Sequence, residues 1–552
     1  MARNLRVPQR DQVMLLPVDL REWLPEDDLV WHVLDVVDQL DLDEFYARYR
    51  INGQGGAAYD PAMMLALTIY AHAVGVRSSR MIERACTRDA GFKVVCGLLV
   101  PDHSTITRFV KNHREAIEGL FAQVLRLCHA AGMARLGVIA IDGTKIAANA
   151  SWAKSYTSEA LAHQVAEEQA AFEELAAQLV GQQITTDEAE DAEHGPDGGG
   201  RGDDLPPQLR GKAERLQRLK KTKADLDARD AAAREQMRTA QAAKQAAWDA
   251  ATAAADQGHG PRPHGPRPKD EVTYGQARTR RRRRGKDGEF VAPPAPRAST
   301  TDPDSRRMKA KHGFVQGYNA QAATTTDQII VGQLVSQHPT DHHQFGDVLD
   351  HVTTTLRTAG ITPQQPDQQP DQQPDQQPDQ QPDQQPDQQP DQQPEQQPDQ
   401  QPDQQPDQQP VEQQLIAAAA QVEELGVVLA DAGYANEETF AQAEAAGVHL
   451  IAPLASDEKL HLGTDPAAGQ NLSERPATAR AQTKLRTPTG RDLYKLRGQT
   501  AEPVFGQLKD RRGLRQFATR GLPSVRAEFS LACTVHNVVK LIGARTSTPA
   551  PA

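Results

Sequence analysis

The spacing of apolar residues divides the chain into stretches with helical, strand-like and irregular patterns. Up to about residue 135, apolar positions recur every three or four residues, as in LVWHVLDVVDQL and PAMMLALTIYAHAVG, which predicts amphipathic helices. Asp60 followed by Pro61 has the pattern of a helix cap with proline at the first helical position. Residues 1–135 are therefore predicted to form a helical N-terminal domain.

The last short helix of this region, expected to open at Asp102 or Ser104, is rich in hydrogen-bond donors. Its early turns carry Ser104, Thr105, Arg108 and Lys111. Donors on the first turns of a helix are what a recognition helix presents to DNA, so Arg108 is a predicted DNA contact and the domain a candidate for DNA-end binding. The alternative is an ordinary helical bundle with a solvated charged face.

Short apolar runs rich in valine and isoleucine predict buried strands. The first, LGVIAIDGTKIAANAS, is expected to end at Asp142 and Gly143. GFVQGYNAQAATTTDQIIVGQLVSQ predicts two further strands, and GVVLADAGY predicts a strand that ends at Asp431. A helix capped by Asn436 and a strand in VHLIAP follow, and residues from about 500 to 544 are expected to be helical. The sequence thus predicts an α/β domain built from residues 136–152, 301–362 and 411–545.

Two insertions interrupt this domain. Within residues 153–300, Ala, Gln, Glu and Lys dominate 158–180 and 206–256, which predicts long helices that could form an antiparallel pair. The run Arg280–Arg284 that follows them is either a flexible phosphate-binding segment or a solvated linker. Residues 363–410 repeat Pro-Asp-Gln-Gln, and this tract lacks the large apolar residues that a core requires, so we expect it to be disordered or polyproline-like.

The net charge of −12 is at first sight unfavourable for binding nucleic acid. The repeat tract, however, contains eleven acidic and no basic residues, which accounts for nearly all of the excess. Residues 475–545 contain fifteen Lys or Arg against four acidic residues. A basic C-terminal region is the electrostatic pattern of a nucleic-acid partner.

Several classes of protein are disfavoured by the sequence. No apolar run is long enough for a membrane helix, and the first residues lack the apolar region of a signal peptide, so we expect a cytoplasmic protein without a membrane partner. The four cysteines, Cys86, Cys96, Cys128 and Cys533, form no CxxC pair. Reduced thiols in the core are the expectation, and a zinc or disulfide framework is not.

Three carboxylates stand at positions suited to metal-dependent phosphate chemistry. Asp142 and Asp431 are at the ends of predicted strands, and Glu502 is in the first turn of the predicted C-terminal helix. Strand ends converge at one edge of an α/β sheet, and carboxylates with substrate phosphates are the usual Mg²⁺ ligands. With 74 acidic residues in the chain, spacing alone does not single out this triple.

The sequence around these residues resembles the insertion-sequence DDE transposases of the RNase H-like superfamily. IDGTKIAANAS, TTDPDSRRMKAKHGFVQGYNAQAATTTDQIIVGQ, LADAGYANEETF and YKLRGQTAEPVFGQLKDRRGLRQFATRGLPSVRAEFSLACTVHN are similar to successive segments of the catalytic domain. The N-terminal helical region is similar to the domain that precedes catalysis in many members. The resemblance covers about two thirds of the chain and implies an RNase H-like mixed sheet with helices, interrupted by a helical insertion.

The resemblance implies roles for individual residues. Asp142, Asp431 and Glu502 would be the catalytic, metal-binding triad, with Mg²⁺ (or Mn²⁺) as the ion and two ions expected. The family's Tyr, Arg, Glu, Lys signature falls on Tyr494, Arg497, Glu502 and Lys509, of which Tyr494, Arg497 and Lys509 would contact DNA. Lys509 follows Glu502 by seven residues on one helical face, beside the metals.

Further polar residues are candidates for DNA contact, metal binding or a local structural role. Arg512 is expected to contact DNA phosphates together with Arg511 and Arg515, and Lys145 is either a DNA contact or solvated. His342 and His343 resemble a metal-ligand pair that no further ligand completes. Asp302 and Asp304 are expected to serve only the turn that contains them.

The expected reaction is cleavage at transposon ends followed by transfer of the 3′-OH into target DNA. The partners are then transposon-end and target DNA, and a homodimer or higher assembly is expected because two ends must be brought together. The alternatives are an RNase H-like nuclease without strand transfer, or a DNA-binding protein without catalytic activity.

Overall fold

The computed structural model describes twelve ranges of the chain. They are residues 19–49, 58–194, 207–259, 262–265, 267, 283–284, 290–291, 296–310, 313–361, 411–420, 425–454 and 475–547. The Pro-Asp-Gln-Gln tract and residues 280–282 of the arginine run lie outside the described residues, so the predictions made for them stay predictions.

The N-terminal region is helical, as the apolar periodicity predicts. Asp28, Asp60 and Asp102 each cap a helix by accepting hydrogen bonds from backbone N–H groups of its first turn, and Pro61 is the first residue after the Asp60 cap. The elements are η1 (Leu20–Trp23), α1 (Leu29–Val37), α2 (Asp43–Tyr46), α3 (Pro61–Ala73), α4 (Ser79–Arg88), α5 (Ala90–Val95), α6 (His103–Asn112) and α7 (Arg114–Ala130).

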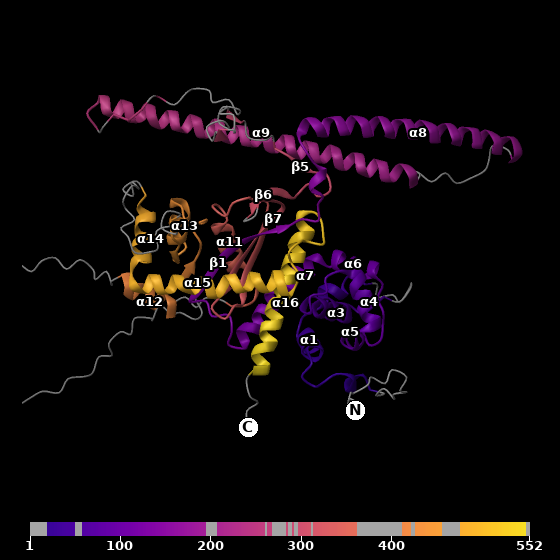
Figure 1. The fold of residues 1–552 in the computed structure, drawn as a ribbon, viewed down its shortest axis with the longest axis horizontal. Coiled ribbons are helices and arrows are strands. Elements are labelled where there is room, and N and C mark those ends of the chain that lie inside the picture. The colour runs from indigo at the N-terminus through magenta and orange to yellow at the C-terminus, as the bar shows by residue number, and fades with distance from the viewer. Residues whose placement is uncertain are drawn as a thin grey trace, which may run out of the picture.

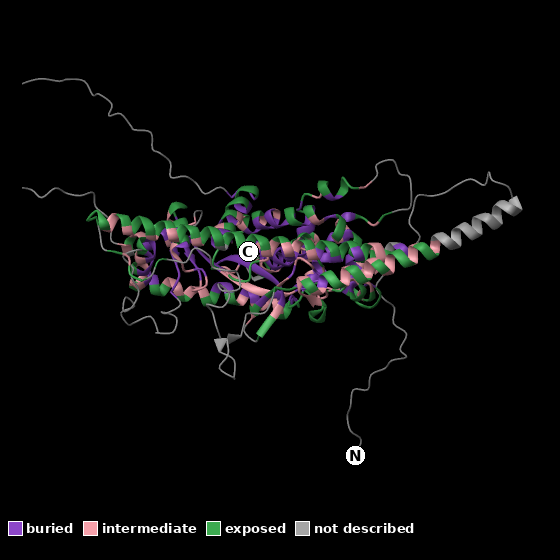
Figure 2. Ribbon diagram, turned by 90° about the horizontal axis from the view of Figure 1, so that it is seen from above, coloured by how far each residue is buried: buried purple, intermediate pink, exposed green. Residues whose placement is uncertain are grey.

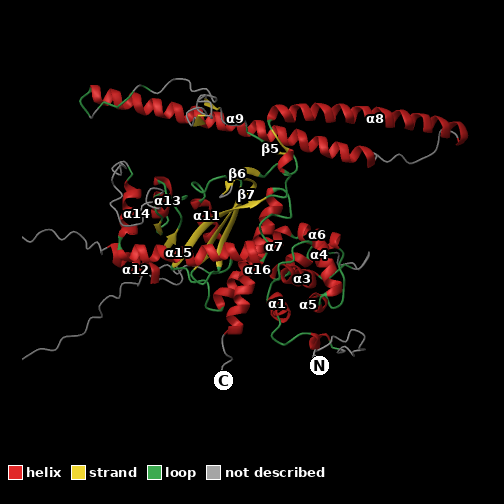
Figure 3. Cartoon of the chain, in the orientation of Figure 1, coloured by secondary structure: helices red, strands yellow, loops and turns green. Residues whose placement is uncertain are grey.

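The centre of the molecule is a mixed six-stranded sheet (Figures 1 and 3). Its strands are β1 (Val138–Ala147), β6 (Arg306–Ala310), β7 (Gly313–Thr325), β8 (Ile330–Ser336), β9 (Val427–Leu429) and β10 (His449–Ile451). The order is β10-β9-β1-β7-β6, and β8 also pairs with β7. β7 is antiparallel to β1, β6 and β8, whereas β9 is parallel to β1 and β10 is parallel to β9. The fold class is thus mixed α/β.

The prediction that the first strand ends at Asp142 and Gly143 is wrong. β1 continues to Ala147, and Asp142 pairs with Ala322 in the middle of the strand. Gly143 instead allows the Gln321 side chain to approach the strand closely, because a Cβ atom at this position would lie 2.4 Å from the side-chain nitrogen of Gln321. Glycine at this position marks a crowded spot on the sheet, which the sequence pattern does not distinguish from a strand terminator.

Helices cover the sheet and complete the domain. They are α11 (Phe345–Thr358), α12 (Val411–Ala420), α13 (Glu437–Ala445), α14 (Pro476–Arg486), α15 (Pro488–Gly506) and α16 (Leu522–Ser547). Asn436 caps α13 as predicted. The helix that carries Glu502 does not begin near Thr500, however: it begins at Pro488 after a Thr487 cap. Glu502 therefore lies near the C-terminal end of α15, which runs into the π-helical turn η4 (Gln507–Arg511).

One hydrophobic core joins the N-terminal helices to the sheet. Val33, Leu125, Ile139, Val331 and Val535 belong to one buried cluster. The C-terminal helix α16 packs against α7 and α3 on one side and β8 on the other, so it connects the two regions. All four cysteines are free and buried in this structure, as predicted for core thiols.

The segment between β1 and β6 is a long helical hairpin that projects from the sheet (Figure 1). α8 (Ser158–His194) and α9 (Pro207–Asp256) are antiparallel, because Ser158 bonds Asp227 while Lys212 bonds Ala171. Of the hairpin residues whose burial the structure describes, most are exposed or half-buried (Figure 2). Short strands β2 (Ser155–Tyr156) and β5 (Ala298–Ser299) pair at its base, η2 (Trp152–Lys154) precedes them, and β3 (Arg283–Arg284) pairs with β4 (Phe290–Val291).

Candidate active site

Two of the predicted acids lie side by side because of the sheet register. β1 and β9 are parallel, with Ala140 paired to Leu429, so continuing the register by two residues places Asp142 beside Asp431. Asp142 accepts a hydrogen bond from the backbone of Gly143 (2.8 Å), and Asp431 accepts one from the backbone of Gly433 (2.9 Å). Each carboxylate is therefore oriented by a backbone hydrogen bond, and the two residues occupy neighbouring positions on adjacent strands.

Arg497 connects this pair to the third predicted acid. Its guanidinium lies 3.2 Å from Asp142 Oδ1 and 3.6 Å from Glu502 Oε1. The Arg497 and Asp142 side chains are 14% and 15% exposed, whereas that of Glu502 is 62% exposed. Arg497 was predicted to contact DNA, but in this structure it is an internal counter-ion between two acids of the triad.

Asp142, Asp431 and Glu502 are not arranged as a ready-made metal site in this structure. Among the described residues, no group of three or more His, Cys, Asp or Glu side chains is arranged to hold a metal ion. The guanidinium of Arg497 contacts both Asp142 and Glu502. Its Nε atom is buried and has no hydrogen-bond partner in the described part of the chain.

Burial dominates the ionisation of the aspartate pair. It raises the pKa of Asp142 to about 6, and Asp431 and Asp341 add to this effect while Arg497 opposes it. Burial also raises the pKa of Asp431, again against Arg497. A low-dielectric site penalises two neighbouring anions unless a cation compensates them, and Arg497 compensates only in part.

A further acid at this site, Asp341, was missed by the sequence reasoning. It accepts hydrogen bonds from Lys145 (2.9 Å), Asn319 (2.7 Å) and Gln321 (2.7 Å). Burial raises the pKa of Asp341, but Lys145 and the two amides together hold it below its usual value. The available signal was an acid a few residues after the predicted strand of GQLVSQ, directly before His342.

Gln321 links this acid to the buried Tyr434, whose hydroxyl donates to the Gln321 side-chain oxygen. Lys145, which was predicted to contact DNA or be solvated, is instead a partner of Asp341 with a side chain that is 14% exposed. Lys145, Asn319, Gln321 and Tyr434 are thus joined to Asp341 by one hydrogen-bond network, which holds these side chains in place next to the acids.

Two other residues of the family signature are Lys509, which lies near Asp142, and Tyr494, which is on the same helix as Arg497. Lys509, in η4, donates from Nζ to the hydroxyl of Thr144, two residues beyond Asp142 on β1. Burial lowers the pKa of Lys509, while Asp142 and Asp510 favour its charged form. Tyr494 is on α15, one turn before Arg497, and is half-buried.

Several predicted contacts are placed elsewhere. Arg512 is 6% exposed and bonds His536 Nδ1 (3.1 Å), so the predicted DNA contact is corrected to an internal role. Ser104 and Thr105 both donate their hydroxyls to Asp102, the N-cap residue of α6, whereas Arg108 is exposed on α6.

Other side chains near the sheet have structural partners. His343 lies 3.8 Å from Glu438, and Asp302 is buried, accepting from the Tyr318 hydroxyl at 2.8 Å. The latter role exceeds the turn chemistry expected for Asp302. Of the two other arginines, Arg511 is exposed and Arg515 pairs with Asp510.

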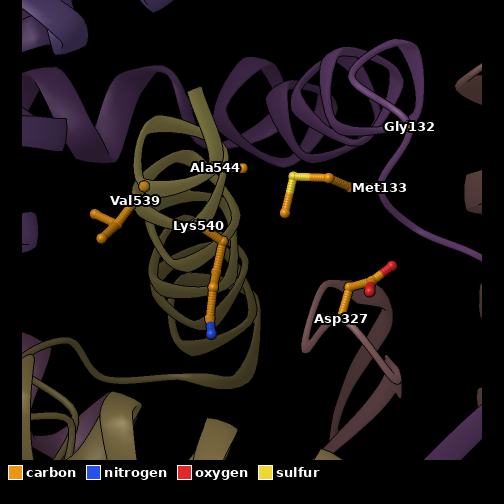
Figure 4. Close-up of a pocket in the computed structure, with 7 residues that line it drawn as sticks. Gly132, Met133, Asp327, Val539, Lys540 and Ala544 are labelled. Carbon is orange, nitrogen blue, oxygen red and sulfur yellow. The ribbon is translucent and has the colours of Figure 1, made fainter. Parts of the chain in front are cut away.

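A cavity of about 550 Å³ lies away from these acids, between α16 and the turns before β1 and β8 (Figure 4). Asp327 and Lys540 approach it from opposite sides, and Lys540 donates to the Gln328 side chain at 2.7 Å. None of the predicted site residues lines this cavity. The candidate site is therefore the acidic surface of the sheet and not an enclosed pocket.

Three family models match parts of the chain. Residues 18–112 match a transposase domain (DUF772), residues 467–542 match a transposase DDE domain, and residues 381–501 match a DDE superfamily endonuclease. The endonuclease span includes Asp431 and Arg497, the transposase DDE span includes Arg497 and Glu502, and Asp142 lies outside all three spans. No curated protein and no solved structure matches the chain.

The matches support a transposase-type, DNA-cleaving function of the DDE class. Together with the N-terminal match they support an insertion-sequence DDE transposase, the family that the sequence resembles. DNA is accordingly the class of partner. Among the described residues, no helix is both long and apolar enough to cross a membrane.

Proposed function

We propose that the chain is a DNA transposase in which Asp142, Asp431 and Glu502 hold divalent metal ions, Mg²⁺ or Mn²⁺, and in which the sheet is RNase H-like. The observation that carries this proposal is the parallel register of β1 and β9, which brings two acids 289 positions apart in sequence to neighbouring places. Arg497 extends the group to Glu502 on α15.

The succession of elements supports the RNase H-like assignment. The strand β1, with the first acid, is followed by the three antiparallel strands β6, β7 and β8 and by the helices α11 and α12. The parallel strand β9, which precedes the second acid, the helix α13, the parallel strand β10 and the helices α14 and α15 then follow, and α15 carries the third acid. Once the helical hairpin is set aside, the strands and helices expected from the sequence occur in this order, with β6, α12 and α14 in addition.

The donor set fits a hard divalent cation. All three side chains offer carboxylate oxygens, which Mg²⁺ and Mn²⁺ prefer, and the buried aspartates lack full compensation for their charge. When bound, such ions activate the attacking oxygen and stabilise the leaving oxygen of a phosphodiester. DDE superfamily endonucleases are generally dependent on divalent metals.

The residues of the site would bind the metal ions and position the DNA. Asp142 and Asp431, fixed by Gly143 and Gly433, supply rigid ligands, and the exposed Glu502 supplies a movable one. Lys509, held beside β1 by Thr144, places a positive charge where a phosphate of the DNA approaches the acids. Tyr494, three residues before Arg497 on α15, packs against the hydrophobic cluster that contains Val138 and Ala140.

The proposed reaction is hydrolysis at a transposon end to give a 3′-OH, followed by attack of that hydroxyl on target DNA at the same acids. Each step breaks one phosphodiester bond; in the second, a new one forms to the transposon end. Because two ends are joined to one target, we expect a dimer or higher assembly on DNA.

A strand-transfer assay tests the function. A labelled transposon end is incubated with target plasmid and Mg²⁺, using wild type, Asp142→Asn and the control Asp492→Asn, whose exposed side chain pairs with Lys495 on α15. We expect joined product from wild type and the control but none from Asp142→Asn. Cleavage without joining would instead indicate a nuclease, and binding without cleavage a protein lacking catalytic activity.

A further inference from the structure

The N-terminal helical region has a strong charge asymmetry along the chain. Residues 19–76 contain eleven acidic and three basic residues, whereas residues 77–114 contain eight basic and three acidic residues. The second half comprises α4, α5 and α6, of which α4 and α6 pack against each other (Figure 1). The positive charge is therefore concentrated on one part of the region.

Three arginines of α4 form a stripe on its outer face. Arg80, Arg84 and Arg88 are spaced by four residues and all are exposed, while Ile82 and Cys86 on the opposite face are buried. In the described part of the chain, none of the three guanidinium groups has a salt bridge or side-chain hydrogen bond. Successive arginines are about 6 Å apart along the helix, and no partner within the described residues satisfies them.

The neighbouring acids are already engaged, so they do not neutralise the stripe. Glu83 lies 3.1 Å from His103. Asp89 caps α5 by accepting from the Phe92 backbone, and Asp102 caps α6. The arginines of α4 thus face solvent without a matching negative charge.

The start of α4 is attached to the segment that follows the candidate active site. Arg77 donates to the carbonyls of Gly513 (2.8 Å) and Gln516 (3.1 Å) and forms a buried ion pair with Glu528. Gly75, at φ +83°, packs so closely on the Arg511 carbonyl that a Cβ atom would lie 2.9 Å from it. The α4 stripe is therefore held in a fixed position relative to η4 and Lys509.

We propose that Arg80, Arg84 and Arg88 form a surface that binds the phosphate backbone of duplex DNA and continues the path of the DNA away from the acids. This inference rests on the proposed function and assigns α4 a role that the sequence reasoning gave to α6. Arg108 and Lys111, both exposed on the adjacent α6, extend the surface. Because arginine contacts to phosphate carry no base information, this surface binds DNA irrespective of sequence.

The salt dependence of DNA binding tests the proposal. The full-length protein is titrated with a labelled duplex of arbitrary sequence at 50–200 mM salt, by fluorescence anisotropy. The triple variant R80Q/R84Q/R88Q is compared with R48Q/R238Q/R262Q, which removes three exposed cations that pair with Glu115, Glu235 and Asp256. Both variants lose the same net charge.

Loss of three phosphate contacts makes the negative slope of log K against log salt shallower by about 2.7. The factor by which the affinity falls between 50 and 200 mM salt is then roughly 40-fold smaller than for wild type. We expect this change in R80Q/R84Q/R88Q and little change in the control. Equal slopes for the two variants and wild type would overturn the inference while leaving the proposed function standing. A change in oligomeric mass with unaltered DNA binding would also overturn it and indicate a protein partner. If wild type bound no duplex at all, the proposed function itself would fail.

Discussion

Replacing Asp142 by Asn is predicted to stabilise the metal-free protein at neutral pH. Burial raises the pKa of Asp142 from 3.8 to about 6, even with Arg497 as a partner. A carboxyl whose folded pKa is raised contributes its full stability only below about pH 4 and loses it as the pH rises toward 6. The difference between the unfolded value of 3.8 and the folded value of about 6 lowers the free energy of unfolding at pH 7 by about 3 kcal/mol. Asparagine keeps the shape and removes the charge that burial penalises.

The assay is urea unfolding in EDTA at pH 7 and at pH 4. We expect Asp142→Asn to exceed wild type in unfolding free energy by about 1–3 kcal/mol at pH 7, and the difference to shrink toward zero at pH 4, where both side chains are neutral. Asp492→Asn, at a 74% exposed position, is the control and is expected to change stability by less than about 0.5 kcal/mol. An Asp142→Asn protein that is no more stable than wild type at pH 7 would refute the reasoning.

Three further predictions follow from the contacts of the site. Arg497→Gln is expected to tighten Mn²⁺ binding about tenfold or more, because the competing cation is removed; calorimetry that shows weaker binding would contradict this. Gly143→Ala should cost about 1–3 kcal/mol in chemical denaturation, since its Cβ atom would lie 2.4 Å from the Gln321 side chain and 2.8 Å from Asp341; unchanged stability would show that the strand tolerates the crowding. Arg77→Met should cost about 3–5 kcal/mol because it leaves the buried Glu528 without its cation, whereas a loss below 1 kcal/mol would argue against that ion pair.

The sequence predicted the elements of the sheet better than their ends. The strand before Asp431 and the helix capped by Asn436 were placed correctly, because an apolar run, an acid and a capping residue follow one another locally. Gly143 was misinterpreted as a terminator because a glycine that ends a strand and one that admits a neighbouring side chain look alike in sequence. The beginning of α15 was placed too late, although Thr487 and Pro488 form a cap signal of the kind recognised at Asp60.

The contacts of the site required the three-dimensional structure. Asp341 lies near Asp142 and Asp431 and is held there by Lys145 and the amides of β7. Arg497 contacts Asp142 across 355 positions of sequence. The arginine run after Lys509 looks uniformly basic, yet Arg512 is buried and Arg511 is exposed. Long-range pairing and the direction of side chains in an irregular turn are set by tertiary packing, which local patterns do not encode.

The measurement that tests the central claim most directly is anomalous scattering from crystals of the protein grown with Mn²⁺. The account predicts an anomalous peak bound by Asp142 and Asp431, with the Arg497 side chain withdrawn from Asp142, and no such peak in crystals of Asp142→Asn. Mn²⁺ bound elsewhere, or the same peak in the Asp142→Asn variant, would contradict the assignment of these carboxylates as the metal-binding site.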